Sequence, residues 1–369
     1  MIYLDYAATT PVDERVAEKM LPFLTSVFGN PASTHAFGQK AKAAVDVARR
    51  EVAAAIGADP AEIIWTSGAT ESNNLAIRGS AELYVSKGKH IVTMKTEHPS
   101  VLETCQQLEK EGWTVTYLAP QKNGLIDLEN LKQSLRDDTV LVSVMQVNNE
   151  TGVIQPLEKI AEITAAKNIL FHVDAAQSIG KLALDIKNID LISLCAHKSY
   201  GPKGIGALYI RRKPRVRVAP QIYGGGQEQG MRSGTLATHQ MVGMGEAFMI
   251  AHRELQEEQK RMCTLRDYFL TEIAKNKSIT LNNNFDHVVP SIINLRFSII
   301  TAEAFMKSNP ELAISSGSAC QSKGIEPSYV LRAMGLSVDE AKNSVRISFG
   351  RFSTKRDVET LLQALSAAI

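Results

Sequence analysis

The feature that most constrains the fold is a regular alternation of short apolar runs with longer helical segments. Seven runs rich in Val, Ile and Leu are predicted strands: 62–67, 90–96, 115–119, 140–147, 169–174, 191–196 and 206–211. Several are apolar at consecutive positions, which is typical of strands covered on both faces of a sheet. Most connections are long enough to hold helices, and residues 39–56 carry Ala and Val at three- and four-residue steps. The pattern predicts an α/β domain with a mostly parallel sheet.

The pattern changes after about residue 245. Residues 247–276 are predicted to form one long helix, and a strand candidate at 291–297 and the segments 312–320, 344–350 and 357–369 follow it. These features indicate a smaller α+β domain packed on the first. The 369 residues suit two domains at about 150 residues each. We place the large domain at 16–250 and the small domain at 1–15 together with 251–369.

Composition excludes several classes of function. The chain has 41 Lys and Arg against 39 Asp and Glu, so its net charge of +2 creates no long-range field for DNA, RNA or an anionic membrane. No apolar run approaches the ~20 residues that cross a bilayer. The N-terminal segment has acidic residues where a signal peptide would be basic, and we expect a cytoplasmic protein. The four cysteines, at 105, 195, 263 and 320, lack the close spacing of zinc ligands, so we expect no metal site.

Polar groups follow several of the predicted strands, at the edge of the sheet where ligands gather. The turn at Gly68, Ala69 and Thr70 would open a helix with free backbone N–H groups, which suits a phosphate. His98 and Asn149 follow two other strands. Taken singly, each has an ordinary structural explanation: a helix cap, a hydrogen-bonded histidine and a turn.

Two charged residues at neighbouring strand ends are harder to explain as structure. Asp174 ends one buried strand, and Lys198 follows the next one 24 residues later. Burying such charges is costly unless each has a partner. Pyridoxal phosphate would balance both, because it requires a Schiff-base lysine, an acid opposite its ring nitrogen and donors for its phosphate. Lys198, Asp174 and the Ala69–Thr70 turn with His197 would fill these roles.

Cys320 differs from the other cysteines in its surroundings. It follows a run of small residues at 315–319, which makes a poor core and favours an exposed thiol that acts as a nucleophile. The glycine-rich segments 201–206 and 224–230 match neither nucleotide-binding spacing and are interpreted as loops.

Together these motifs resemble those of the group I cysteine desulfurases (NifS/IscS-like), within the pyridoxal-phosphate-dependent aminotransferase class V family. The resemblance covers nearly the whole chain through YLDYAATTPV (3–12), FGNPAS (28–33), TSGATESNNLA (66–76), TEHPSVL (96–102), VNNETGV (147–153), HVDAAQSIGK (172–181), AHKSYGPKGIGALY (196–209), GMRSGT (230–235), SSGSAC (315–320), EPSYVLRAMG (326–335) and RISFGRF (346–352).

The resemblance implies a fold type I pyridoxal-phosphate enzyme that works as a homodimer. Its large domain would bind the cofactor, and its small domain would carry the nucleophile. The implied cofactor-binding residues are Lys198, Asp174, Gln177 at the phenolic oxygen, Ala69, Thr70, His197, Cys195, Asn149 and Thr235 from the other subunit. His98 would stack on the ring and join Lys198 and Cys320 as a catalytic residue, while Asn149 and Arg351 would bind the substrate carboxylate.

The implied reaction converts L-cysteine to L-alanine. Lys198 would move the α-proton, and the Cys320 thiolate would attack the substrate sulfur and keep it as a persulfide. The sulfur would then pass to acceptor proteins for iron–sulfur cluster assembly or thiolation.

The chain departs from the family pattern at Cys195, Gln227 and Gln229, and it ends at Ile369 without the extension that housekeeping members use to dock a scaffold. We therefore expect weak binding to such a scaffold. A specialised desulfurase for DNA phosphorothioation or tRNA thiolation, a selenocysteine lyase and an inactive sulfur-relay scaffold remain alternatives.

Overall fold

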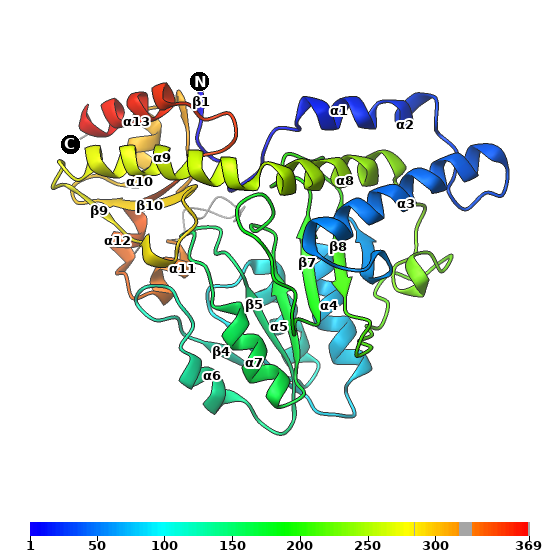
Figure 1. Cartoon of the computed structure of the whole chain (residues 1–369). Coiled ribbons are helices and arrows are strands. Elements are labelled where there is room, and N and C mark those ends of the chain that lie inside the picture. Colours follow the sequence, from blue (N-terminus) through cyan, green and yellow to red (C-terminus); the bar gives the residue numbers. More distant parts are fainter. Residues whose placement is uncertain (284, 317–326, 368–369) are drawn as a thin grey trace.

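The computed structural model describes residues 1–283, 285–316 and 327–367, and a large sheet of strand order β2-β8-β7-β6-β5-β3-β4 lies at its centre (Figure 1). Its strands are β2 (Ile63–Thr66), β3 (His90–Met94), β4 (Thr114–Leu118), β5 (Thr139–Met145), β6 (Leu170–Asp174), β7 (Leu191–Cys195) and β8 (Gly206–Ile210). The pairings from β4 through β3, β5 and β6 to β7 are parallel, and β8 runs antiparallel to both β7 and β2. The predicted α/β class and all seven predicted strands are confirmed.

Helices cover both faces of this sheet. One core joins α3 (Ala36–Ile56), α6 (Leu128–Ser134), α7 (Leu157–Ala166) and α8 (Thr238–Arg253) to the sheet, and another joins α4 (Ala69–Leu83) and α5 (Pro99–Lys110) to it. The predicted apolar face of α3 is buried, and Gly57 ends the helix in the left-handed conformation at φ 73°. Two short helices, α1 (Glu14–Met20) and α2 (Pro22–Thr25), precede α3, and single 3-10 turns lie at Pro60–Glu62 and Glu228–Gly230.

A second group of elements has its own sheet and core. The strands β9 (Ile279–Leu281), β10 (Ile292–Phe297) and β12 (Ser344–Ser348) pair antiparallel, and β1 (Ile2–Tyr3) pairs parallel with β11 (Leu312–Ala313). The helices are α9 (Leu255–Ile273), α10 (Ala302–Ser308), α11 (Tyr329–Ala333), α12 (Val338–Lys342) and α13 (Lys355–Ala367), with a 3-10 turn at Phe285–His287. This is the expected α+β part, while the exact division at 16–250 stays a prediction.

The single helix predicted over 247–276 is wrong. Two helices, α8 and α9, lie end to end and meet at Glu254, whose ψ of 2° leaves the helical range (Figure 1). The local sequence does not signal the break, because Glu254 is a good helix former; its carboxylate is held by Arg15, far away in the sequence. Within the described residues, no helix is both long and apolar enough to cross a membrane.

Candidate active site

The sheet topology brings the predicted polar residues to one edge. The strands β5, β6 and β7 are parallel neighbours, so their carboxyl ends lie side by side. β8 is antiparallel to β7, and β2 is antiparallel to β8, so β2 runs in the same direction as β7. β2 therefore also ends at this edge, where the turn after it leads into α4. β3 is a parallel neighbour of β5 and ends at the same edge, so the segments that follow β2, β3, β5, β6 and β7 surround one space.

That space is a cavity of about 420 Å³, within the usual range for small-molecule sites. The predicted residues that line it are Ala69, Thr70, His98, Asn149, Asp174, Gln177, Cys195, His197 and Lys198. The sequence thus identified most of the polar wall of this cavity.

Asp174 is held in place by two neutral N–H donors, so its negative charge remains available for a cationic ligand. Its side chain is buried and accepts hydrogen bonds from Asn73 Nδ2 at 2.8 Å and from the backbone N–H of Ala176 at 2.9 Å. Asn73 also donates to Ser100 Oγ at 2.9 Å. The sequence analysis missed Asn73 and Ser100. The three-residue step from Thr70 to Asn73 puts both on one face of α4 and could have identified Asn73.

The turn between β2 and α4 forms the anion-binding corner. Gly68 caps α4 without a side-chain hydrogen bond, so the first N–H groups of a 15-residue helix have no partner within the helix. Gly68 has φ 152°, and a Cβ on Gly206 would lie 2.6 Å from the Gly68 Cα atom. Glycine is therefore required at both positions, and the backbone itself forms this wall.

Lys198 follows β7 and has no carboxylate partner among the described residues. The neighbouring His197 ring contacts Thr9 Oγ1 at 3.1 Å, and its burial next to Lys198 and Lys203 lowers its pKa to about 4. A neutral His197 can accept or donate one hydrogen bond at the cavity wall. Lys203 also lines the cavity and adds positive charge that the sequence analysis did not assign.

His98 caps α5 through its ring. The backbone N–H of Ser100 donates to His98 Nδ1 at 3.1 Å, and burial lowers the pKa of the ring. The ring is therefore neutral near pH 7 with its proton on Nε2. This arrangement orients the imidazole at the cavity wall, where the family resemblance implies that it stacks on a ligand ring.

Gln177 and Cys195 contribute the remaining predicted groups. Gln177 Nε2 donates to the Ala7 carbonyl oxygen at 2.7 Å. The Cys195 thiol donates to the Ala176 carbonyl oxygen at 3.7 Å, and burial raises the pKa of this thiol. Cys195 is therefore neutral at the wall of the cavity.

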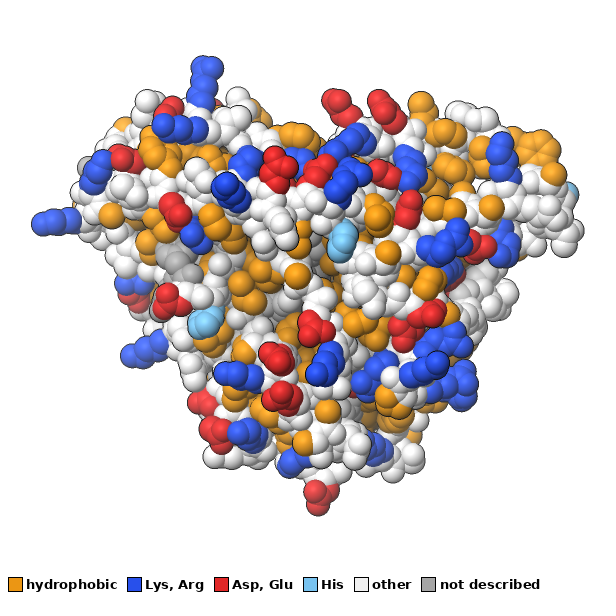
Figure 2. Space-filling model, in the orientation of Figure 1, with side chains coloured by type: hydrophobic (Ala, Val, Ile, Leu, Met, Phe, Trp, Pro, Cys, Tyr) orange, Lys and Arg blue, Asp and Glu red, His pale blue; other side chains and the backbone are white. Residues whose placement is uncertain are grey.

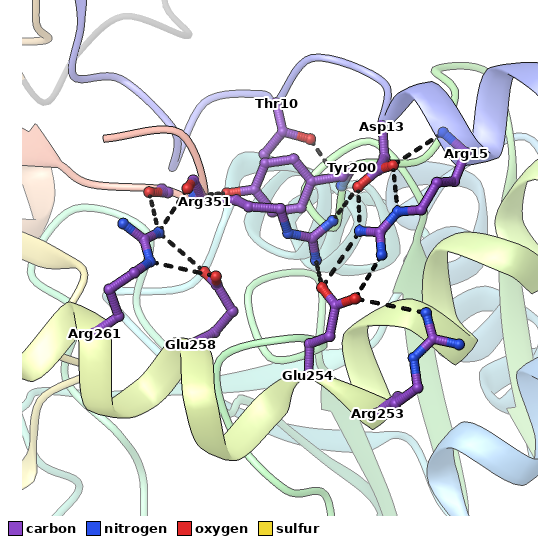
Figure 3. Close-up of polar contacts among 10 residues, drawn as sticks. Thr10, Asp13, Arg15, Tyr200, Arg253, Glu254, Glu258, Arg261 and Arg351 are labelled. Carbon is purple, nitrogen blue, oxygen red and sulfur yellow. Dashed lines mark hydrogen bonds and ion pairs between the residues drawn. The ribbon is translucent and has the colours of Figure 1, made fainter. Parts of the chain in front are cut away.

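Arg351 lies elsewhere. Its guanidinium is 2.5 Å from Asp13 Oδ2 and 3.8 Å from a Glu254 oxygen, and it lies over the Tyr200 ring at 4.2 Å (Figure 3). Among the described residues, Arg351 lines a small cavity of about 40 Å³ next to Lys198, not the large cavity. Arg15 bridges Asp13 and Glu254 in the same cluster, at 2.8 and 2.6 Å.

One further predicted residue, Thr235, does not line the cavity. Thr235 is exposed in the loop before α8. The predicted nucleophile Cys320 lies outside the described residues.

The donor set fits pyridoxal phosphate. Asp174 would face the ring nitrogen, the N-terminus of α4 with Thr70 and His197 would hold the phosphate, and Lys198 would bind the aldehyde carbon. The anion-binding corner walled by Gly68 and Gly206 and the amine of Lys198, which has no carboxylate partner among the described residues, lie in the same cavity.

Comparisons with known proteins agree with this chemistry. The aminotransferase class-V family model matches residues 2–361. The cysteine desulfurase IscS of Serratia proteamaculans (strain 568) is 54% identical over 373 residues, covering 100% of this chain and 92% of its own length.

Two solved structures are also similar over nearly the whole chain. A NifS-like protein has a TM-score of 0.93 at 36% identity and covers 100% of this chain and 98% of its own. The structure of SspA in complex with cysteine has a TM-score of 0.85 at 39% identity and covers 96% of this chain and 100% of its own.

Proposed function

Because this chain belongs to the aminotransferase class-V family, as a cysteine desulfurase that uses pyridoxal phosphate, we propose that the large cavity is its active site. The observation that carries the proposal is the pair of Asp174, the last residue of β6, and Lys198, which follows the neighbouring strand β7; both line one cavity. The chemistry that pyridoxal phosphate supplies when bound is an electron sink for the α-carbon of an amino acid.

The substrate is L-cysteine, and its α-proton is moved by Lys198. Support comes from the place of Lys198 at the cavity wall without a carboxylate partner in the described part of the chain, so its amine is available to the substrate. His98, neutral and protonated on Nε2, borders the same space and orients the reacting groups.

The substrate carboxylate is bound by Asn149 and Arg351. Asn149 lines the large cavity, whereas the Arg351 guanidinium pairs with Asp13. Arg351 therefore has to exchange the Asp13 carboxylate for that of the substrate. Replacement Arg351→Gln should raise KM for L-cysteine more than it lowers kcat, because binding is lost while Lys198 is untouched.

Sulfur is accepted by Cys320. Its thiolate attacks the sulfur of cysteine, an S–S bond forms, and the C–S bond of the substrate breaks. The released carbon takes up a proton, so that L-cysteine and a protein thiol give L-alanine and a protein persulfide. The equation balances without an external oxidant or reductant.

The test is a comparison of Cys320→Ser with Cys195→Ser in the holoenzyme. Both variants should keep the visible absorbance of the bound cofactor. Only Cys320→Ser should lose alanine release and persulfide labelling, since a hydroxyl does not replace a thiolate that attacks sulfur. Full alanine release by Cys320→Ser would contradict the assignment of the nucleophile.

We also infer that the enzyme is a homodimer in which Thr235 of each chain reaches the phosphate in the other. Hydrophobic side chains gather over the outer ends of α2 and α3 (Figure 2). Leu21, Leu24, Phe28 and Phe37 there are 55–68% exposed, which favours a covered surface. Phe28→Glu should shift the sedimentation coefficient to that of a monomer, whereas Val85→Glu, at another exposed apolar site, should not; an unchanged coefficient for Phe28→Glu would contradict the interface.

Sulfur then passes from Cys320 to acceptor proteins for iron–sulfur clusters or thiolation, as the 54% identity to IscS over the whole chain supports. A cytoplasmic location belongs to this proposal, since Cys105, Cys195 and Cys263 are free thiols that suit a reducing compartment.

A further inference from the structure

Lys181 is a second lysine beside Lys198, and it takes no part in the proposed reaction. The residue as a whole is partly exposed, but its ammonium group lies inside the protein, where burial and the charge of Lys198 lower its pKa to about 8. Among the described residues it has no carboxylate partner. A buried cation without a counter-charge is costly, and such groups cluster at functional sites.

The contacts of Lys181 lead directly to the active site. Its Nζ donates to Gln177 Oε1 at 3.1 Å and lies 3.5 Å from the carbonyl oxygen of Lys198. The backbone around Lys181 is fixed from α9, because Gln259 Nε2 donates to the Lys181 carbonyl oxygen at 2.7 Å. The ammonium group is therefore held against Gln177 and the Lys198 backbone.

These contacts determine the orientation of the Gln177 amide. Oε1 faces a cationic donor, and Nε2 donates to the Ala7 carbonyl oxygen. The reverse orientation would place an N–H against the ammonium group and an oxygen against a carbonyl oxygen. Gln177 lines the large cavity, so the second N–H of Nε2 remains for an acceptor there.

Resting on the proposed function, we propose that Lys181 is a positioning residue that orients Gln177 toward the anionic ring oxygen of the cofactor and supplies positive charge behind Lys198. The anionic cofactor in turn supplies the counter-charge that Lys181 lacks. Lys181 therefore acts on the cofactor indirectly, by orienting the Gln177 amide and by the electrostatic effect of its positive charge.

Other charged and titratable groups face Lys181 from every side. The groups that line the small cavity with it or interact with it are Tyr6, Cys195, His197, Lys198, Tyr200, Glu258 and Arg351. The Glu258 carboxylate is paired with Arg261 at 3.1 Å, so it does not neutralise Lys181. The cation Arg351 has its own counter-charge in Asp13, and Lys198 carries the charge most directly coupled to Lys181.

The proposal predicts a spectroscopic change. A positive charge disfavours protonation of a nearby nitrogen, so its removal should raise the pH midpoint at which the absorbance of the Lys198-bound cofactor changes. In the holoenzyme, Lys181→Met should raise this midpoint by about one pH unit. Lys181→Arg, which keeps the charge, should stay near the wild-type midpoint.

Two further variants separate charge from folding and hydrogen bonding. Lys181→Gln keeps a donor for Gln177 but loses the charge, so it should shift the midpoint as Lys181→Met does, and it carries the test if the Met variant does not fold. Lys187→Met removes an exposed charge six residues away and should leave the midpoint unchanged. A wild-type midpoint in Lys181→Gln would overturn the inference, whereas a wild-type protein that takes up no cofactor would overturn the proposed function instead.

Discussion

Arg351 and Lys198 are two cationic residues that line the same small cavity, yet they differ in how their charges are balanced. Arg351 is clamped by Asp13 and has a second carboxylate, Glu254, within 3.8 Å. Lys198 has no carboxylate in an ion pair with it in the described part of the chain, and two further positive side chains, Lys181 and Lys203, lie nearby.

The difference separates a cluster whose charges are paired within the protein from a lysine whose charge is not. The cluster around Arg351 ties the N-terminal segment to the junction of α8 and α9, and its pairs satisfy each other (Figure 3). The charge of Lys198 forms no ion pair among the described residues, so it adds little to the free energy of unfolding. Its amine is therefore available for reaction. Substitutions at the two places should therefore affect different quantities.

The largest expected effect is on catalysis, from Lys198→Ala. Turnover of L-cysteine should fall at least about 10³-fold, because the group that moves the α-proton is lost. The free energy of unfolding of the cofactor-free protein should change little, since no carboxylate loses its partner. Alanine release and urea unfolding measure the two effects, and a large loss of stability would break the comparison.

The opposite outcome is expected for Asp13→Ala. Arg15 and Arg351 would lose a partner that is nearly fully buried, and the free energy of unfolding should fall by about 2–3 kcal/mol. Hydrogen bonds from Arg15 hold the pKa of Asp13 at about 2, below its ordinary value near 4. The stabilisation is therefore fully present above about pH 4 and is lost as the pH falls through 2.

Urea unfolding at pH 7 and at pH 3 measures this contribution. Asp13→Asn is the matched control, because asparagine keeps the N-cap of α1 while removing the charge. If Asp13→Asn is as stable as the wild type at pH 7, the cap and not the ion pairs carries the effect.

Glu150 is an acidic counterpart of Lys198, because it is buried without a direct ion pair among the described residues. Burial raises its pKa to about 7, and Ser328 Oγ donates to its carboxylate. The folded protein holds this proton more tightly than the unfolded chain, so stability falls as the pH rises from about 4.5 to 7. Glu150→Gln should add about 1–3 kcal/mol at pH 8 and much less at pH 5, as measured by urea unfolding. Equal effects at both values of pH would contradict the assignment.

The sequence predicted the strands and the wall of the large cavity for a physical reason. Apolar runs locate the strands of a buried sheet, and the polar residue after each run falls at the carboxyl edge where parallel strands end together. Asp174 and Lys198 could therefore be paired in advance although 24 residues separate them.

Contacts between distant segments were not predictable in this way. Arg351 pairs with Asp13 across 338 residues, and Glu254, at the break between α8 and α9, pairs with Arg15 across 239 residues. Such contacts leave no local pattern. Lys181 was missed for the same reason: the burial of its ammonium group depends on contacts with other segments of the chain, which the local sequence does not indicate.

The smallest effect is expected at Cys195, where the chain departs from the family pattern. The thiol donates to the Ala176 carbonyl oxygen at 3.7 Å and lines the large cavity. A hydroxyl is a stronger donor than a thiol, so Cys195→Ser should retain the cofactor at least as tightly as the wild type. Alanine release should change by less than about threefold, because the group is neutral and moves no proton. Dialysis followed by absorbance of the retained cofactor measures the first effect. Markedly weaker retention would show that the buried thiol contributes through its packing. Cofactor binding beside Lys198 would then depend on the shape of the cavity wall as well as on its charges.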